Sequence, residues 1–114
     1  MALMAMAIPI LPGKTEQFRR IIEEERGRWH KDYVASRQRL GVRERVFLQS
    51  TPMGDLVIVT LEGDDPARAF QGLATGDDDY TRWFVQQVKE VHGVDLTQPL
   101  PGPLPELVED SQGG

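Results

Sequence analysis

The residues best suited to chemistry lie close together between positions 25 and 33. At about 100° per residue, a helix through this region places one stripe of side chains within about 60° of a single direction. The stripe is Phe18, Ile22, Glu25, Trp29, Asp32, Tyr33, Ser36 and Leu40. It is apolar at both ends and polar in the middle. A carboxylate on a packing face costs free energy unless it is paired or faces a cavity.

We therefore identify Glu25 and Asp32 as candidate catalytic residues, and Trp29 and Tyr33 as candidate ligand contacts. If a pocket exists, partial shielding from water would let such a carboxylate exchange protons with an organic substrate near neutral pH. The alternative is structural. In that case Glu25 and Asp32 form ion pairs with arginines of the following strands, such as Arg43 or Arg45, or reach solvent.

His30 is the third candidate catalytic residue, and Arg37 a further candidate ligand contact. The positive charges of Arg26 and Arg37 favour a neutral imidazole at His30, which could act as a base. His92 precedes Gly93 and is expected to cap the end of a helix. The two histidines lack the local spacing of metal ligands, so no metal site is predicted.

Two other clusters of side chains are better explained by structural roles than by catalysis or ligand binding. Helical spacing of Trp83, Phe84, Val88 and Val91, with Tyr80 a turn earlier, predicts core packing or a dimer contact. The acidic run 77–79 predicts a helix cap and not a calcium site. The sequence contains no nucleophile elbow, P-loop or dinucleotide fingerprint, so we expect no cofactor.

Composition narrows the class of protein. The chain has 114 residues, a net charge of −5 and a pI near 5.0, which disfavours a nucleic-acid partner. It has no cysteine, which fits a cytoplasmic protein. The apolar run 1–11 lacks a basic segment and is too short to span a bilayer, so we interpret it as a strand, with no membrane partner.

The elements that must position these residues form an α+β pattern. We predict a strand in the apolar run, one long helix over 15–40 capped by Thr15, and a hairpin of strands 42–50 and 56–63. Two further helices follow: one runs from Pro66 to Ala74, and the other starts at a cap within 77–79 and ends at His92. This order is that of the ferredoxin-like split βαβ. Residues 1–98 form the domain and 99–114 a proline-rich tail, partly docked. The strands should largely bury Val46, Leu48, Val57, Val59 and Leu61.

A resemblance adds to this interpretation. The residues that carry it are the segments 12–18, 35–42, 49–52, 82–84, 92–96 and 101–107. With these segments the chain resembles an uncharacterised family of short bacterial proteins in the ferredoxin-like dimeric α/β-barrel superfamily, which has antibiotic-monooxygenase-like relatives.

The resemblance implies a homodimer whose paired sheets form a barrel, with a small organic ligand or haem in a cleft between sheet and helices. Relatives that degrade haem use an asparagine, and this sequence contains none, so their catalytic residues cannot be transferred. The expected fourth strand is not evident, because the prolines of the tail remove backbone donors. Two functions stay open: a cofactor-independent monooxygenase- or isomerase-like enzyme, or a non-catalytic dimeric small-molecule-binding or interaction module.

Overall fold

The computed structural model describes residues 1–100 and 102–113 of the chain. Its strands are β1 (Ala2–Pro9), β2 (Val42–Thr51) and β3 (Gly54–Gly63). Its helices are α1 (Thr15–Arg26), α2 (His30–Arg39), α3 (Pro66–Gln71), the short 3₁₀ turn η1 (Gly72–Ala74) and α4 (Asp79–His92). The α+β class predicted from the sequence is confirmed.

The three strands form one antiparallel sheet in the order β1-β3-β2, with β3 in the centre. The register pairs Val59 of β3 with Met6 of β1 and with Val46 of β2. Since side chains alternate between the faces of a strand, these three lie on one face. The predicted hairpin of β2 and β3 is confirmed. The described residues contain no fourth strand.

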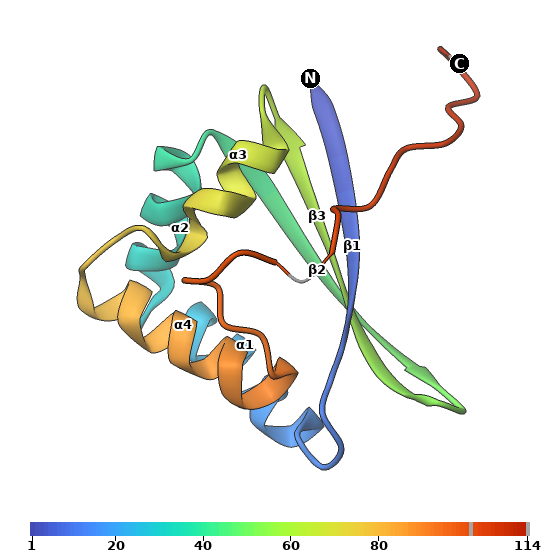
Figure 1. The fold of residues 1–114 in the computed structure, drawn as a ribbon. Helices are drawn as coiled ribbons and strands as arrows, with labels where there is room; N and C mark the ends of the chain where they lie inside the picture. The colour runs from blue at the N-terminus through green and yellow to red at the C-terminus, as the bar shows by residue number, and fades with distance from the viewer. Residues whose placement is uncertain (101, 114) are drawn as a thin grey trace.

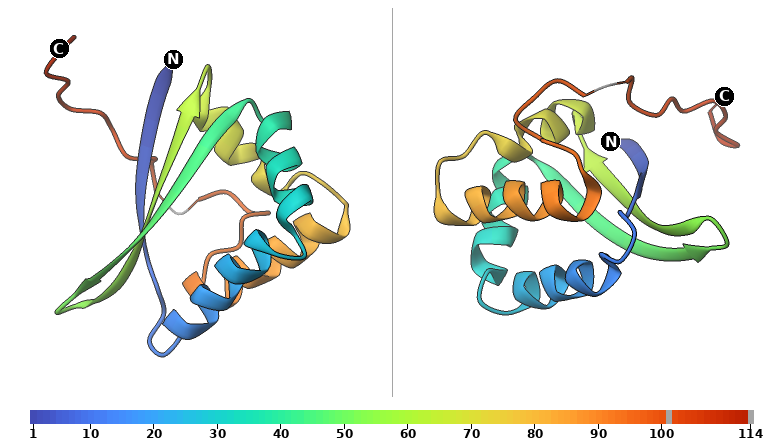
Figure 2. Two further views of the ribbon diagram at one scale, coloured as in Figure 1. Left: turned by 180° about the vertical axis from the view of Figure 1, so that it is seen from behind. Right: turned by 60° about the horizontal axis from the view of Figure 1, so that its bottom comes forward.

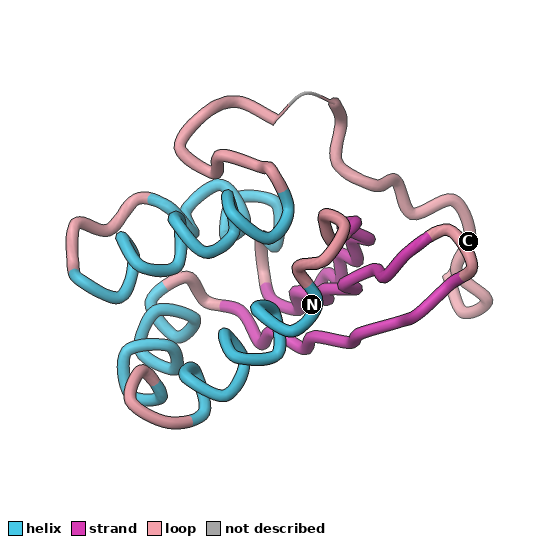
Figure 3. The backbone as a smooth tube through the Cα atoms, turned by 90° about the horizontal axis from the view of Figure 1, so that it is seen from below, coloured by secondary structure: helices cyan, strands magenta, loops and turns pink. Residues whose placement is uncertain are grey.

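All helices lie on one side of the sheet, as Figures 1 and 2 show. Figure 3, seen from below, separates the helices from the strands in the same way. Two core clusters fill the space between the layers. The buried members are Ile10, Phe18, Ile21, Val57 and Val91 in the first, and Leu61, Phe70 and Leu73 in the second. The opposite face of the sheet carries no helix among the described residues.

The prediction of one long helix over 15–40 is wrong. The chain forms two helices, because Gly27 leaves the helical path with φ −106° and ψ −109°. The carbonyl of Glu24 accepts hydrogen bonds from the amides of both Gly27 and Trp29, which ends α1 before His30 starts α2. Glycine permits this break at low conformational cost.

Two of the three N-caps predicted from the sequence are present in the structure. Asp65 caps α3 by accepting from the amide of Arg68, and Asp78 caps α4 by accepting from the amide of Thr81. The prediction that Thr15 caps the first helix is wrong. Thr15 is already helical, and its hydroxyl donates to Asp55 at 2.6 Å.

Burial along the strands is less complete than predicted. Val57 and Leu61 in the central strand are buried, and Leu48 and Val59 are half-buried. Val46 is 37% exposed, because its edge strand borders a groove described below. Among the described residues, no helix is long and apolar enough to cross a membrane.

The chain after α4 follows the helical side of the sheet before leaving it. Leu96, Leu100 and Leu104 pack against the second core cluster. Past this point the chain passes the β1 edge and ends on the side of the sheet opposite the helices (Figures 1 and 2).

Candidate functional site

A groove of about 590 Å³ lies between α1, the start of α2 and the edge strand β2. Its apolar lining is Phe18, Ile22, Val46 and Leu48, and its polar lining is Arg19, Glu23, Glu25, Arg26, His30 and Tyr33. A smaller apolar cavity of about 80 Å³ adjoins it inside the core and also borders Glu25. The structure therefore has a groove between helix and sheet, at the β2 side of the sheet.

Glu25 is the buried acid of this groove. It stands in the last turn of α1 and is 8% exposed. Its Oε2 accepts a hydrogen bond of 2.5 Å from the hydroxyl of Tyr80 in α4. Burial raises the pKa of Glu25 from 4.5 to about 7, against the lowering effects of the Tyr80 hydrogen bond and the charge of Arg37. The carboxyl is thus poised to change protonation state near neutral pH.

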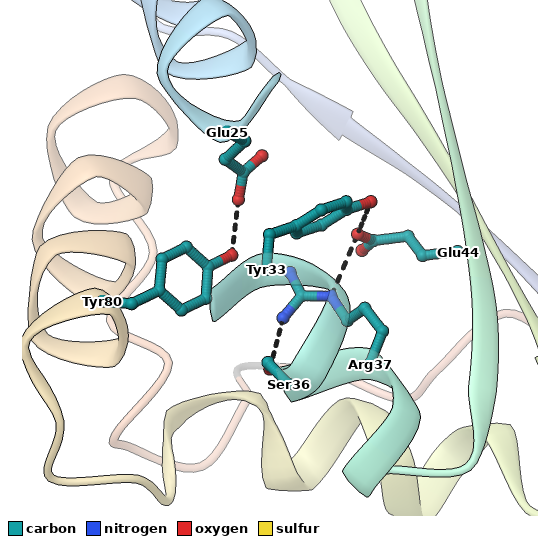
Figure 4. A network of polar contacts seen from close by, with 6 residues as sticks. All are labelled: Glu25, Tyr33, Ser36, Arg37, Glu44 and Tyr80. Carbon is teal, nitrogen blue, oxygen red and sulfur yellow. Dashed lines mark hydrogen bonds and ion pairs between the residues drawn. The ribbon is translucent and has the colours of Figure 1, made fainter. Parts of the chain in front are cut away.

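A second buried carboxylate, Glu44, extends from β2 toward α2 (Figure 4). Its Oε1 accepts hydrogen bonds from the hydroxyl of Tyr33 at 2.8 Å and from Nε of Arg37 at 3.1 Å. Both side chains of the Arg37–Glu44 ion pair are almost fully buried. Burial and the charge of Glu44 raise the pKa of Tyr33 above its ordinary value, so Tyr33 remains a donor.

The guanidinium of Arg37 is held on several sides. It lies 4.9 Å from the ring centroids of both Tyr33 and Phe84, and Nη1 donates to the hydroxyl of Ser36 at 2.9 Å. Nη2 is buried and has no hydrogen-bond partner among the residues that the structure describes. Arg37 is therefore part of the wall behind the groove, and it is not among the lining residues.

The break at Gly27 decides where the other candidates lie. Trp29 turns toward α4, with its ring centroid 5.7 Å from that of Tyr80 and 5.5 Å from that of Trp83. Asp32 is exposed to solvent. Neither lines the groove, whereas Glu25, His30 and Tyr33 do. The structure thus brings three of the six predicted residues to one groove.

The structural alternative describes Asp32, which reaches solvent, but it does not describe Glu25. Arg45 pairs with Glu62 at 3.7 Å, and Glu25 is held by a tyrosine. The acid that pairs with a buried arginine is Glu44, and the sequence analysis did not identify this acid. The alternation of Val42, Glu44 and Val46 could have identified it, because this pattern places an acid on the inward face of a strand.

Comparisons with known proteins do not extend these observations. No family model, no curated protein and no solved structure matches this chain. Within residues 1–100 and 102–113, no group of three His, Cys, Asp or Glu side chains could hold a metal ion. Function must be inferred from the groove and the buried polar groups beside it.

His92 occupies a structural position. Its Nδ1 lies 2.8 Å from the carbonyl oxygen of Pro9, and its ring packs edge-on against Phe18. Burial lowers the pKa of His92, partly offset by the Pro9 carbonyl. The ring joins the end of α4 to the end of β1. This contact does not test the prediction that His92 caps the C-terminus of α4.

Proposed function

We propose that the protein binds a small organic molecule in the groove between α1, α2 and β2. The observation that carries this proposal is Glu25: a buried carboxyl with a pKa of about 7 that borders a groove large enough for a ligand. A mostly apolar pocket with a few converging polar groups is the usual form of such a site.

The lining suggests the class of ligand. Phe18, Ile22, Val46 and Leu48 offer an apolar surface for a ring system or a short aliphatic body. Below pH 7 the protonated Glu25 can donate to a carbonyl or ether oxygen, and above it the carboxylate can accept from a hydroxyl. Arg19 and Arg26 at the same groove can pair with an anionic group of the ligand, and Glu23 offsets part of their charge.

A catalytic role rests on the same carboxyl. A general acid or base works best when its pKa lies near the working pH, which Glu25 meets. The chemistry that this supports is proton transfer to or from carbon without a cofactor, as in an isomerase-like or a cofactor-independent monooxygenase-like enzyme. The alternative is a non-catalytic binding module, in which Glu25 only selects the ligand.

We further propose a ferredoxin-like arrangement of the dimeric α/β-barrel type as the scaffold. The strand order β1-β3-β2 and the placement of every helix on one face of the sheet (Figure 1) support it. The fold alone does not assign a reaction, because one scaffold hosts many functions.

Binding in the groove is tested with the fluorescent probe 8-anilinonaphthalene-1-sulfonate, which combines an aromatic body with an anion. We expect saturable binding that is weakened at least tenfold by Val46→Trp, since the larger ring fills the groove. Asp64→Asn, at an exposed residue outside the groove lining, is the control and should bind like the unmodified chain. Equal affinity for Val46→Trp and the unmodified chain would place the site elsewhere.

Compounds that displace the probe then separate enzyme from binding module. Each is incubated with protein in deuterium oxide, and exchange of its acidic C–H protons is followed by NMR. A proton-transfer enzyme catalyses the exchange, and Glu25→Gln abolishes it while ligand binding persists. Binding without exchange in the unmodified chain supports the non-catalytic module.

A further inference from the structure

A small inner cavity lies behind the groove, in the core between the sheet and the helices. Its volume is about 80 Å³. Its walls are mostly aliphatic and aromatic side chains: Val57 and Val59 of β3, Phe70 and Leu73 of α3 and η1, and Phe84 and Val88 of α4. An apolar cavity of this kind stays dry and accepts an apolar guest, as one of about 150 Å³ accepts benzene or xenon.

The inner cavity and the groove share part of their walls. Four residues border both spaces: Phe18, Ile22, Glu25 and Val46. Ile22 is half-buried and Val46 is 37% exposed. Side chains that reach solvent change rotamer within nanoseconds, so the apolar wall between the two spaces can open for a ligand. One molecule can therefore occupy the groove and the inner cavity together.

Glu25 is the polar group with a free position where the two spaces meet. Two other polar residues border the inner cavity, and both have partners: Glu44 accepts from two side chains of α2, and His92 lies at the carbonyl of Pro9. The Oε2 atom of Glu25 accepts from Tyr80. Its other oxygen, Oε1, points away from that tyrosine (Figure 4). Oε1 is thus the atom that meets a ligand passing from the groove into the inner cavity.

The size of the inner cavity limits what can enter it. A water-sized group takes up about 30 Å³ in a liquid. A cavity of about 80 Å³ therefore holds about three methyl or methylene groups. It is too small for a ring of the size of benzene, whereas the groove of about 590 Å³ is large enough for one. The two spaces thus suit different ends of one ligand.

We propose that the ligand is a carbonyl compound with an alkyl end of about three carbons, which fills the inner cavity while the carbonyl oxygen accepts from protonated Glu25. The rest of the molecule lies in the groove. This inference rests on the function proposed above and adds the chemical class of the ligand and a limit on its chain length. The inner cavity, and not the larger groove, then decides which homologous compounds bind tightly.

Alkyl phenyl ketones test the chain-length limit, because ring and carbonyl stay constant while the alkyl end grows. Acetophenone, butyrophenone and hexanophenone are used to displace 8-anilinonaphthalene-1-sulfonate at pH 6, where Glu25 is mostly protonated. Each methylene removed from water strengthens binding about fourfold. Butyrophenone, with two more methylenes than acetophenone, should therefore bind at least tenfold more tightly. Hexanophenone should bind no better than butyrophenone, because its chain exceeds the inner cavity.

The outcomes of this series separate the two proposals. If none of the ketones displaces the probe, the function proposed for the groove is wrong, and this inference is wrong with it. If acetophenone binds but the affinity does not change with chain length, only the inference about the inner cavity is wrong. A continuous rise in affinity up to hexanophenone would also refute the limit of three carbons.

Variants of Val88 test the inner cavity directly, because Val88 lines it and does not line the groove. Val88→Phe should abolish the advantage of butyrophenone and leave the affinity for acetophenone unchanged. Val88→Ala enlarges the cavity, so hexanophenone should then bind more tightly than butyrophenone. Val108→Phe makes the first exchange at a residue that is 82% exposed and should bind like the unmodified chain. An unchanged preference for butyrophenone in both Val88 variants would overturn the proposal.

Xenon tests the inner cavity without any ligand in the groove. The chain with carbon-13-labelled valine methyls is placed under xenon pressure, and the methyl shifts are followed by NMR. Val57 and Val88, which line the inner cavity, should shift to saturation, whereas the exposed Val108 should not. The shift of Val57 should disappear in Val88→Phe. If the methyls of Val57 and Val88 do not respond to xenon, no apolar guest enters the inner cavity and the proposal is refuted.

Discussion

The hydroxyl of Tyr80 in α4 donates a 2.5 Å hydrogen bond to Oε2 of Glu25 at the end of α1. The two residues are 55 positions apart in the chain. Their contact joins the helix that borders the groove to the helix that closes the core behind it. The hydrogen bond fixes Oε2 of the buried Glu25 carboxyl. Because it comes from a residue far away in the chain, the pKa of Glu25 depends on the tertiary structure.

The first prediction concerns stability and pH. The pKa of Glu25 is raised from 4.5 to about 7 in the folded state. Between these values the unfolded chain loses a proton that the folded chain keeps, so the free energy of unfolding falls as pH rises. At 1.36 kcal/mol per unit, the loss is about 3 kcal/mol. Glu25→Gln should remove this loss, as measured by urea unfolding from pH 4.5 to pH 8.

Glu16→Gln serves as the control for that titration, since its side chain is exposed. It should retain the full pH dependence of the unmodified chain. If Glu25→Gln and Glu16→Gln show the same slope, Glu25 does not titrate in this range.

The second prediction isolates the tyrosine. The Tyr80 hydrogen bond lowers the pKa of Glu25, so Tyr80→Phe should raise it further. Above pH 8 the variant should lose about 1.5–3 kcal/mol of stability, as expected for a hydrogen bond to a charged group. Below pH 5 the loss should be smaller, because Glu25 is neutral there. Carbon-13 NMR of the Glu25 carboxyl measures the pKa directly, and an unchanged value would contradict this role.

The third prediction concerns the buried ion pair of Arg37 and Glu44. Glu44→Leu leaves the guanidinium buried without its carboxylate, which should cost about 3–5 kcal/mol. Adding Arg37→Leu removes the unpaired charge, so the double variant should be more stable than Glu44→Leu alone. Chemical denaturation of both single variants and the double variant completes the cycle. Additive losses would show that the two side chains do not interact.

The fourth prediction tests a close backbone contact. A Cβ at Gly63 would overlap the carbonyl oxygen of Gly41, where the end of β3 meets the start of β2. Gly63→Ala should therefore lower stability by about 1–3 kcal/mol. Gly102→Ala is the control, since its added carbon meets no atom within 4 Å in the described part of the chain, its two neighbours aside. Equal melting temperatures for the two variants would contradict the observed packing.

Local signals in the sequence predicted much of the fold. Alternating apolar residues and the turn at Pro52-Met53 identified the hairpin, because these patterns depend on neighbouring residues alone. Asp65 before Pro66, and Gly93 after His92, marked two helix ends for the same reason. The internal glycine at position 27 was present in the sequence, but a single glycine is compatible with either a continuous or a broken helix.

The sequence by itself determined the α+β class, the hairpin, most helix ends and the presence of an acid near the helix–sheet boundary. Only the tertiary structure decided which acids are buried and what holds them. Because the chain breaks at Gly27, a wheel drawn through residues 18–40 cannot place Trp29 or Asp32, which lie beyond the break. The contacts of Glu25 with Tyr80 and of Arg37 with Glu44 join different elements. Such contacts depend on how the helices pack on the sheet, and no local spacing encodes that packing.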